Sequence, residues 1–141
     1  MPGKITGGCL CGSITYTYDG AVGPASYCHC QDCRRVTGSA FSIAIALDRD
    51  NLHLTGDSLE SYTKLGDSGR QITRHFCRSC GSQLYGTSPR NPDRVYLKAG
   101  TLDDPRVVKP KRQGWLSSAV SWSQIPQGID SYDKGQDSSD A

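Results

Sequence analysis

The sequence predicts an all-β, β-dominated fold built from short strands. Apolar and polar residues alternate in Ser13 to Tyr18 and in Phe41 to Leu47, as they do in strands that bury one face. An apolar period typical of helices persists nowhere for three turns. The chain has 141 residues, the size of one ordinary domain, so these strands are expected to share one core.

Further strands are expected between clusters of turn-forming Gly, Asp, Asn, Ser and Pro. They cover Leu52 to Leu54, Leu59 to Leu65, Gln71 to Phe76, Gln83 to Gly86 and Val95 to Ala99. Helical turns are expected near Asp32 to Val36 and near Trp115 to Ser121.

The last fifteen residues, from Gln127 to Ala141, contain four Asp, one Lys and almost no large apolar side chains. Such a segment buries too little surface to offset the entropy that it loses on ordering. We therefore expect a single domain over residues 1–126 and a polar, acidic, disordered tail over residues 127–141.

Composition argues against several classes of protein. No apolar stretch approaches the ~20 residues of a membrane helix, and the start, MPGKITGGCL, lacks a long apolar signal region. With 16 Lys and Arg against 14 Asp and Glu, the net charge of +2 is too balanced for a protein that coats nucleic acid. Hydrophobic residues make up only 35% of the chain. We expect a cytoplasmic protein whose thin core is held by something besides burial.

The seven cysteines fall into three local sets. The sets are Cys9-x-Cys11, Cys28-x-Cys30-x-x-Cys33 and Cys77-x-x-Cys80, the last followed by Gly81. In a reducing compartment, an odd number of cysteines crowded into short motifs indicates metal binding rather than disulfides. The third set is the most familiar half-site, because its turn points backbone N–H groups at the thiolates and glycine tolerates the positive φ that closes the turn.

Ligand counting divides the cysteines into a group of four and a group of three. A structural zinc needs four ligands, which the two paired half-sites, Cys9 with Cys11 and Cys77 with Cys80, supply. Cys28, Cys30 and Cys33 lie within six residues and can bind a second zinc while leaving its fourth position open. An open position is what a catalytic zinc requires.

Two alternatives to this division stay open on spacing alone. One of Cys28, Cys30 and Cys33 could join Cys77 and Cys80, or His29 could complete a closed site with three cysteines. On an extended backbone the His29 side chain would point away from those of its neighbours, so a solvent-facing histidine, or one behind the ligands, is favoured. His53 and His75 have no partner motif and are assigned no role.

These motifs resemble those of the glutathione-dependent formaldehyde-activating enzyme family, also called the GFA or centromere-protein-V-like family. The resemblance runs from Gly7 to about Pro126 and rests on GGCLCGSITY, CHCQDCRRVTGSAF, FCRSCGS and AGTLDDP, in that order. It implies an Mss4-like, zinc-ribbon-related fold of short-stranded sheets. It also implies a structural zinc at Cys9, Cys11, Cys77 and Cys80, and a catalytic zinc at Cys28, Cys30 and Cys33, giving two zinc ions per chain.

The activity that the resemblance implies is that of a carbon–sulfur lyase, which reversibly adds glutathione to formaldehyde to give S-hydroxymethylglutathione. The family often has a His-containing segment before a Trp, where this chain has KPKRQGWLSSAVSW. Because of this departure, a specialised family member that acts on a larger metabolite is a further possibility. A non-enzymatic zinc-ribbon module that binds another macromolecule is the alternative function.

Glutathione carries carboxylates, for which the planar fork of arginine is suited. The candidates are Arg34 and Arg35, next to Cys33, and then Arg74 and Arg78 around the other cysteine turn. Each could instead be a solvated surface charge. For Trp115 and Trp122 the default expectation is core packing, with a pocket wall as the alternative.

Overall fold

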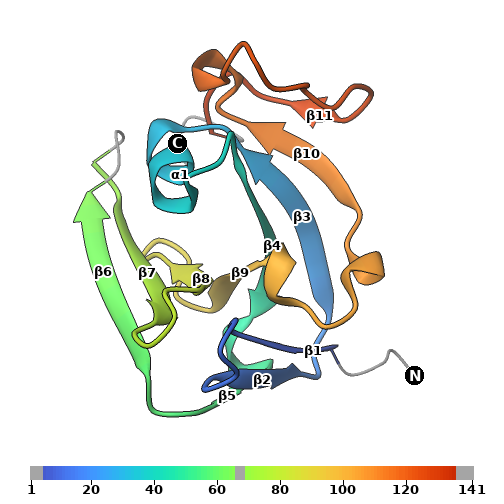
Figure 1. Ribbon diagram of the computed structural model, residues 1–141. Helices are drawn as coiled ribbons and strands as arrows, with labels where there is room; N and C mark the ends of the chain where they lie inside the picture. The colour runs from blue at the N-terminus through green and yellow to red at the C-terminus, as the bar shows by residue number, and fades with distance from the viewer. Residues whose placement is uncertain (1–4, 66–68, 136–141) are drawn as a thin grey trace.

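Two sheets form the frame of the protein in the computed structural model, which describes residues 5–65 and 69–135 (Figure 1). The small sheet is antiparallel, in the order β1 (Ile5–Gly8), β2 (Thr15–Tyr18) and β5 (Leu52–Thr55). The large sheet has eight strands in the order β11-β10-β3-β4-β9-β8-β7-β6. Their bounds are β3 Val22–Cys28, β4 Ser42–Asp48, β6 Leu59–Leu65, β7 Gln71–Cys77, β8 Gln83–Thr87, β9 Arg94–Lys98, β10 Pro110–Gly114 and β11 Asp130–Ser131.

The described residues contain a single α-helix, α1 (Gln31–Thr37), and four short 3₁₀ turns. These turns are Arg49–Asn51, Ala99–Thr101, Pro105–Val107 and Leu116–Ser118. All pairings in the large sheet are antiparallel except those of β10 with β3 and with β11. Among the described residues, no helix has the length and the apolar character that a bilayer crossing requires.

Side chains from both sheets form one core. Tyr16 and Tyr18 of the small sheet are almost fully buried, as are Leu47, Leu84 and Leu97 of the large sheet, and all five belong to one cluster. The alternation that predicted β2 and β4 is the alternation of buried and more exposed positions in both strands. The all-β prediction is therefore confirmed.

Most strands lie where the sequence predicts them, within one or two residues. β1, β3, β10 and β11 were not expected. β3 begins with Val22, Gly23 and Pro24, and its register with β4 is irregular between Val22 and Ala25. Proline removes a ladder donor and glycine weakens a strand, so this sequence has no regular strand pattern. β10 likewise begins with a proline, Pro110.

The C-terminal segment differs from the expected disordered tail over residues 127–135. Asp130 and Ser131 form β11 at the edge of the large sheet, beside β10 (Figure 1). The backbone N–H of Tyr132 donates to the carbonyl of Gln113 at 3.0 Å. The expectation fails here because backbone hydrogen bonds hold this segment against the sheet, and amino-acid composition does not reveal such bonds. Residues 136–141 of the expected tail lie outside the described part of the chain.

Candidate metal centres and cleft

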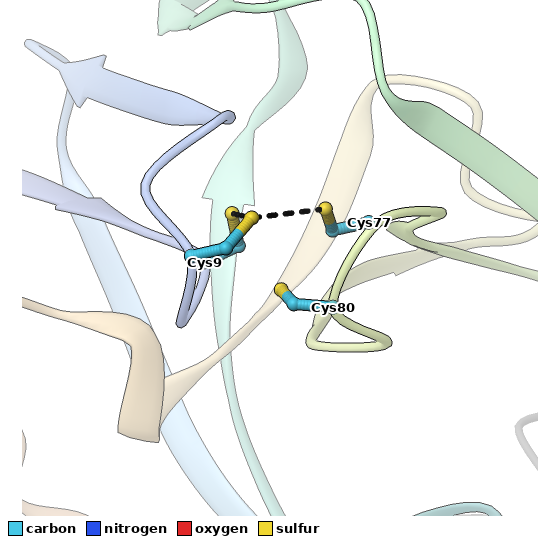
Figure 2. Close-up of side chains that lie close together, drawn as sticks. Cys9, Cys77 and Cys80 are labelled. Carbon is cyan, nitrogen blue, oxygen red and sulfur yellow. Dashed lines mark hydrogen bonds between the residues drawn. The ribbon is translucent and has the colours of Figure 1, made fainter.

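Cys9, Cys11, Cys77 and Cys80 form a four-sulfur group, in which all four sulfur atoms lie within 4.8 Å of one another. The first two come from the loop after β1, whereas Cys77 ends β7 and Cys80 lies in the turn that follows it. Figure 2 shows the sulfur atoms of Cys9, Cys77 and Cys80 turned toward a common centre. The Sγ of Cys11 lies 3.7 Å from that of Cys9 and 3.9 Å from that of Cys77. The structure therefore brings together the four cysteines that ligand counting grouped.

Local backbone geometry shapes both turns of the four-sulfur group. In the first, the N–H of Cys9 donates to the carbonyl of Ile14 at 3.0 Å, and Gly12 between them has a φ of 80°. In the second, the N–H of Gly81 donates to the carbonyl of Cys77 at 2.7 Å, with a φ of 81° at Gly81. Glycine occupies this left-handed region without steric cost, so the backbone of each motif can form a tight turn around its cysteines.

Serine hydroxyls surround the four-sulfur group. The Ser13 Oγ lies 3.3 Å from the sulfur of Cys77 and the Ser58 Oγ lies 3.4 Å from it, and together these hydrogen bonds lower the pKa of Cys77 to about 5. The Ser82 hydroxyl, 3.3 Å from the sulfur of Cys80, lowers the pKa of that thiol to about 7. A lowered pKa favours the thiolate, which is the metal-binding form of cysteine.

The three serines were not predicted as members of the site. Ser13 and Ser82 each follow the last cysteine of a motif by two residues, which is the only signal that the sequence offers. Ser58 is distant in sequence and reaches the group from the turn before β6, so only the fold reveals it.

Cys28, Cys30 and Cys33 form a three-sulfur group, with sulfur atoms again within 4.8 Å of one another. Cys28 ends β3, Cys30 caps α1 and Cys33 lies buried in the first turn of that helix. The N–H of Cys33 donates to the sulfur of Cys30 at 3.3 Å. Hydrogen bonds from the Cys28 and Cys30 side chains lower the pKa of Cys33, and the same contacts raise that of Cys28. Cys33 is therefore the one thiol of this group whose pKa is lowered, since those of Cys28 and Cys30 are raised.

His29 lies between two of these cysteines, yet its ring is not part of either sulfur group. The side chain is buried, at 1% exposure, and its Nε2 lies 3.0 Å from the Oε1 of Gln113. Of the two positions expected for His29, the solvent-facing one is therefore wrong, and the ring instead lies behind the cysteine loop, against Gln113. The ring packs edge-on against Phe41 and stacks with Tyr27, which keeps it away from water.

A cleft of about 500 Å³ opens beside the three-sulfur group, and all three of its cysteines line the cleft. Its lining also includes one acidic and four basic residues, which are Asp32, Arg70, Arg74, Lys98 and Arg112. Asp32 is paired with Lys64 at 2.5 Å. The lining therefore carries more positive than negative charge, and the cleft suits an anionic ligand.

Arg34 and Arg35, the predicted carboxylate contacts, do not line this cleft. Cys33 is the buried residue of the short helix α1, and the two residues that follow it project from other sides of that helix. Of the further candidates, Arg74 lines the cleft and Arg78 does not. Arg78 instead lies 3.5 Å from the carbonyl of Asp57.

Four aromatic residues also line the cleft, namely Tyr27, Tyr96, Trp115 and Tyr132. Trp115 thus forms part of a pocket wall, which was the alternative to core packing. Trp122 is 74% exposed, so core packing is wrong for this residue too.

Known proteins resemble this chain over most of its length. The profile of a family described as glutathione-dependent formaldehyde-activating enzyme matches residues 4–118. A protein of Halomonas elongata is 30% identical in an alignment 129 residues long that covers 86% of this chain and 80% of that protein. A protein of Penicillium rubens is 26% identical in an alignment 133 residues long that covers 91% of this chain and 68% of that protein. Both carry, as a provisional name, glutathione-dependent formaldehyde-activating enzyme.

Among solved structures, a crystal structure of a Rhodobacter sphaeroides protein resembles this one with a TM-score of 0.58 and 24% sequence identity. The likeness covers 72% of this chain and 93% of the other. It supports the fold.

Proposed function

Because the chain belongs to the glutathione-dependent formaldehyde-activating enzyme family, we propose that it is a zinc-dependent carbon–sulfur lyase. The proposed reaction is the reversible addition of the glutathione thiol to formaldehyde or to a related small electrophile. The observation that carries the proposal is the three-sulfur group, which opens into a positively charged cleft. A purely structural module has no need of such an arrangement.

The sulfur positions fit zinc. Four thiolates at a Zn–S distance of ~2.3 Å, arranged as a tetrahedron, lie about 3.8 Å apart. The observed sulfur distances around Cys11 are 3.7 and 3.9 Å. We propose that Cys9, Cys11, Cys77 and Cys80 hold a structural zinc. All seven cysteines are free thiols, which supports both zinc binding and the proposed cytoplasmic location.

We assign Cys28, Cys30 and Cys33 to the second, catalytic zinc. When bound there, zinc would supply a positive charge that stabilises the thiolate form of the substrate. Ser42, which is buried, and Lys98 both face this group and lower the pKa of Cys33. His29, fixed by Gln113 behind the loop, keeps the loop between Cys28 and Cys30 in place.

In the proposed reaction the thiol sulfur bonds to the carbonyl carbon while the C=O π bond breaks. The thiol proton ends on the former carbonyl oxygen, so the product is a hemithioacetal and no co-reactant is consumed. The reverse reaction breaks the same C–S bond. The cleft contributes orientation, because it holds the thiol and the aldehyde together at one end.

Four cations in the cleft suit the thiol that the family name specifies. Glutathione carries two carboxylates and one ammonium group at neutral pH. Arg70 and Arg74 lie on the β7 side of the cleft, whereas Lys98 ends β9 and Arg112 belongs to β10. We propose that Arg74 binds one of these carboxylates, since the arginine fork can form two parallel hydrogen bonds to it.

The test is the rate of exchange between free glutathione, formaldehyde and their adduct, measured by NMR exchange spectroscopy with the zinc-loaded protein. We expect acceleration over the uncatalysed exchange, loss of nearly all of it in Cys30→Ser, and at least a tenfold weaker affinity for glutathione in Arg74→Gln. Arg35→Gln is the matched control, because Arg35 is exposed and outside the cleft lining. Unaccelerated exchange by a protein that carries both zinc ions would leave the binding module as the better interpretation.

A further inference from the structure

One wall of the cleft is made by residues beyond the part of the chain that matches the family. The family match ends at residue 118, whereas Tyr132 and Gly135 line the cleft. They stand beside Trp115, which also lines it. The cleft of this protein is therefore completed by its C-terminal segment.

The strand register places this wall next to the three-sulfur group. Cys28 of β3 lies opposite Gly114 of β10, and Gln113 lies opposite Ser131 of β11. Because β10 and β11 are parallel, the next residues along them, Gly114 and Tyr132, also lie side by side. Cys28, Gly114 and Tyr132 therefore form a row across the sheet. Neighbouring strands are ~4.8 Å apart, which puts the Tyr132 backbone about 10 Å from that of Cys28. Gly114 carries no side chain at the middle position of this row, and the carbonyl oxygen of Lys134 lies 3.1 Å from where its Cβ would be.

Trp115 has an unusual backbone conformation. Its φ of 60° makes it the one non-glycine residue in the described ranges with a positive φ. Three consecutive backbone N–H groups, from Trp115 to Ser117, hold it there by donating to carbonyls of the C-terminal segment. The acceptors are Lys134 at 2.8 Å, Tyr132 at 3.1 Å and Asp133 at 3.1 Å. Backbone strain that the surroundings enforce in this way is concentrated at functional sites.

A buried glutamine joins the same segment to the cysteine loop. The Nε2 of Gln113 donates to the carbonyl of Pro126 at 2.9 Å and to the Oγ of Ser131 at 3.0 Å. Its Oε1 is then left to accept from the Nε2 of His29, whose neighbours in sequence are Cys28 and Cys30. The aromatic wall and the three-sulfur group are therefore held in a fixed relation.

We propose that Trp115 and Tyr132 form an aromatic subsite for a planar, apolar group carried by the electrophile, as in an aryl aldehyde. This inference rests on the proposed lyase function. Glutathione, held by the cations on the β7 side, and a one-carbon aldehyde would together bring no aromatic group to the wall formed by Trp115 and Tyr132 in this cleft of about 500 Å³. The subsite belongs to the electrophile because it lies in the row of Cys28, close to where the C–S bond would form. Arg70 and Arg74 lie on the β7 side of the cleft, where they are available to bind the carboxylates of the thiol.

With an aryl aldehyde the chemistry is unchanged. The thiol sulfur adds to the carbonyl carbon, the thiol proton ends on the oxygen, and the aryl group stays on that carbon. Only the group that contacts Trp115 and Tyr132 differs from the reaction with formaldehyde.

Two stable analogues of the adduct test the subsite without turnover. S-benzylglutathione and S-methylglutathione share the peptide and differ in the group on sulfur. By calorimetric titration of the zinc-loaded full chain, we expect S-benzylglutathione to bind at least tenfold more tightly, a difference of about 1.4 kcal/mol. Trp115→Gly should bring the two affinities to within about twofold of each other. Glycine adopts a φ of 60° freely, so this substitution removes the ring and keeps the backbone.

Tyr132→Leu provides a second variant that does not alter the strained position, and it should also reduce the preference for the benzyl analogue. Trp122→Ala is the matched control, since Trp122 is 74% exposed and outside the cleft lining, and it should leave the preference unchanged. Circular dichroism of each variant confirms that the fold is retained.

The remaining outcomes separate the subsite from the lyase function. Equal affinity of the unaltered chain for the two analogues, or no binding of either, would overturn the subsite, while accelerated glutathione–formaldehyde exchange would still support the lyase. An equal loss of both affinities in Trp115→Gly and Tyr132→Leu would assign these side chains to the peptide part of the thiol, and would also overturn the subsite. Absent binding together with absent exchange would overturn both proposals.

Discussion

Tyr16 illustrates how a single buried polar residue ties the small sheet to the rest of the molecule. Its hydroxyl lies 2.7 Å from the Oγ1 of Thr101, and its ring packs so closely on Gly7 that no side chain would fit there. Burial raises the pKa of Tyr16 to about 12, because the charged phenolate would lose its hydration.

This shift predicts a loss of stability at high pH. The phenol of an unfolded chain titrates near pH 10. Since the folded pKa is higher, the stabilisation by the neutral phenol is complete below pH 10 and is lost as the pH rises towards 12. At pH 7 the free energy of unfolding of Tyr16→Phe should be about 1 kcal/mol lower than that of the unaltered protein, because the hydrogen bond is lost. This difference should become smaller at alkaline pH, where only the unaltered protein loses the stabilisation by the phenol. Urea unfolding of both proteins from pH 7 to 11 measures the difference between their free energies of unfolding.

Tyr62→Phe is the control for this experiment, because Tyr62 is 63% exposed and has no core contact to lose. A gap between Tyr16→Phe and the unaltered protein that stays constant with pH would contradict the assignment of the shift to burial.

At the scale of elements, the C-terminal segment contributes more than its composition suggests. It supplies the carbonyl acceptors for the N–H groups of Trp115 to Ser117 and pairs β11 with the edge of the large sheet. Without it, β10 becomes an edge strand and buried Gln113 loses the Ser131 hydroxyl.

Two truncations test this role. A chain ending at Pro126 loses several hydrogen bonds, each worth ~1 kcal/mol, so we expect its melting temperature to fall by roughly 5–10 °C. A chain ending at Gly135 keeps every contact described here and should melt within about 1–2 °C of the full chain. Differential scanning calorimetry of the two chains makes the comparison. Equal melting temperatures would restore the interpretation of residues 127–135 as a free tail.

The sequence predicts what is local and misses what depends on distant contacts. The alternation in Phe41 to Leu47 predicts β4, and the short spacing within each cysteine motif predicts the local sulfur sets. Spacing alone left open whether the first and last motifs join, and ligand counting favoured the grouping that the fold brings together. β3 and β11 have no such pattern, since Pro24 interrupts one and hydrogen bonds alone hold the other. Adjacency to Cys33 suggested Arg34 and Arg35, whereas the fold brings Lys98 of β9 and Arg70, which directly precedes β7, to the cleft.

For the whole molecule, the two sulfur groups occupy different structural positions. The four-sulfur group joins a loop of the small sheet to a turn of the large sheet (Figures 1 and 2). The three-sulfur group lies within one connection, from the end of β3 into α1. A metal in the first group therefore closes a long loop, and one in the second closes a loop of only a few residues.

We therefore expect two zinc ions per chain and unequal effects of losing each. Structural zinc sites have apparent binding free energies of ~10–16 kcal/mol, comparable to the stability of a whole domain, so Cys80→Ser should unfold the protein or make it insoluble. Cys30→Ser should keep the fold and one zinc. Elemental analysis and circular dichroism of the two variants, side by side, measure this. Unfolding of Cys30→Ser to the same extent would make the second group structural and favour the binding module.

The late position of β10 and β11 in the sequence also sets the order in which the parts of the site can form during synthesis. The three-sulfur group is complete once residue 33 has emerged, and the four-sulfur group once residue 80 has emerged. The aromatic wall needs Trp115 and Tyr132, which directly follow β10 and β11, and of these two strands β10 pairs with β3 near the start of the chain. A nascent chain can thus complete both thiol groups well before its cleft exists. Catalysis on a bulky aldehyde would then report that translation has reached residue 135, whereas zinc content would not.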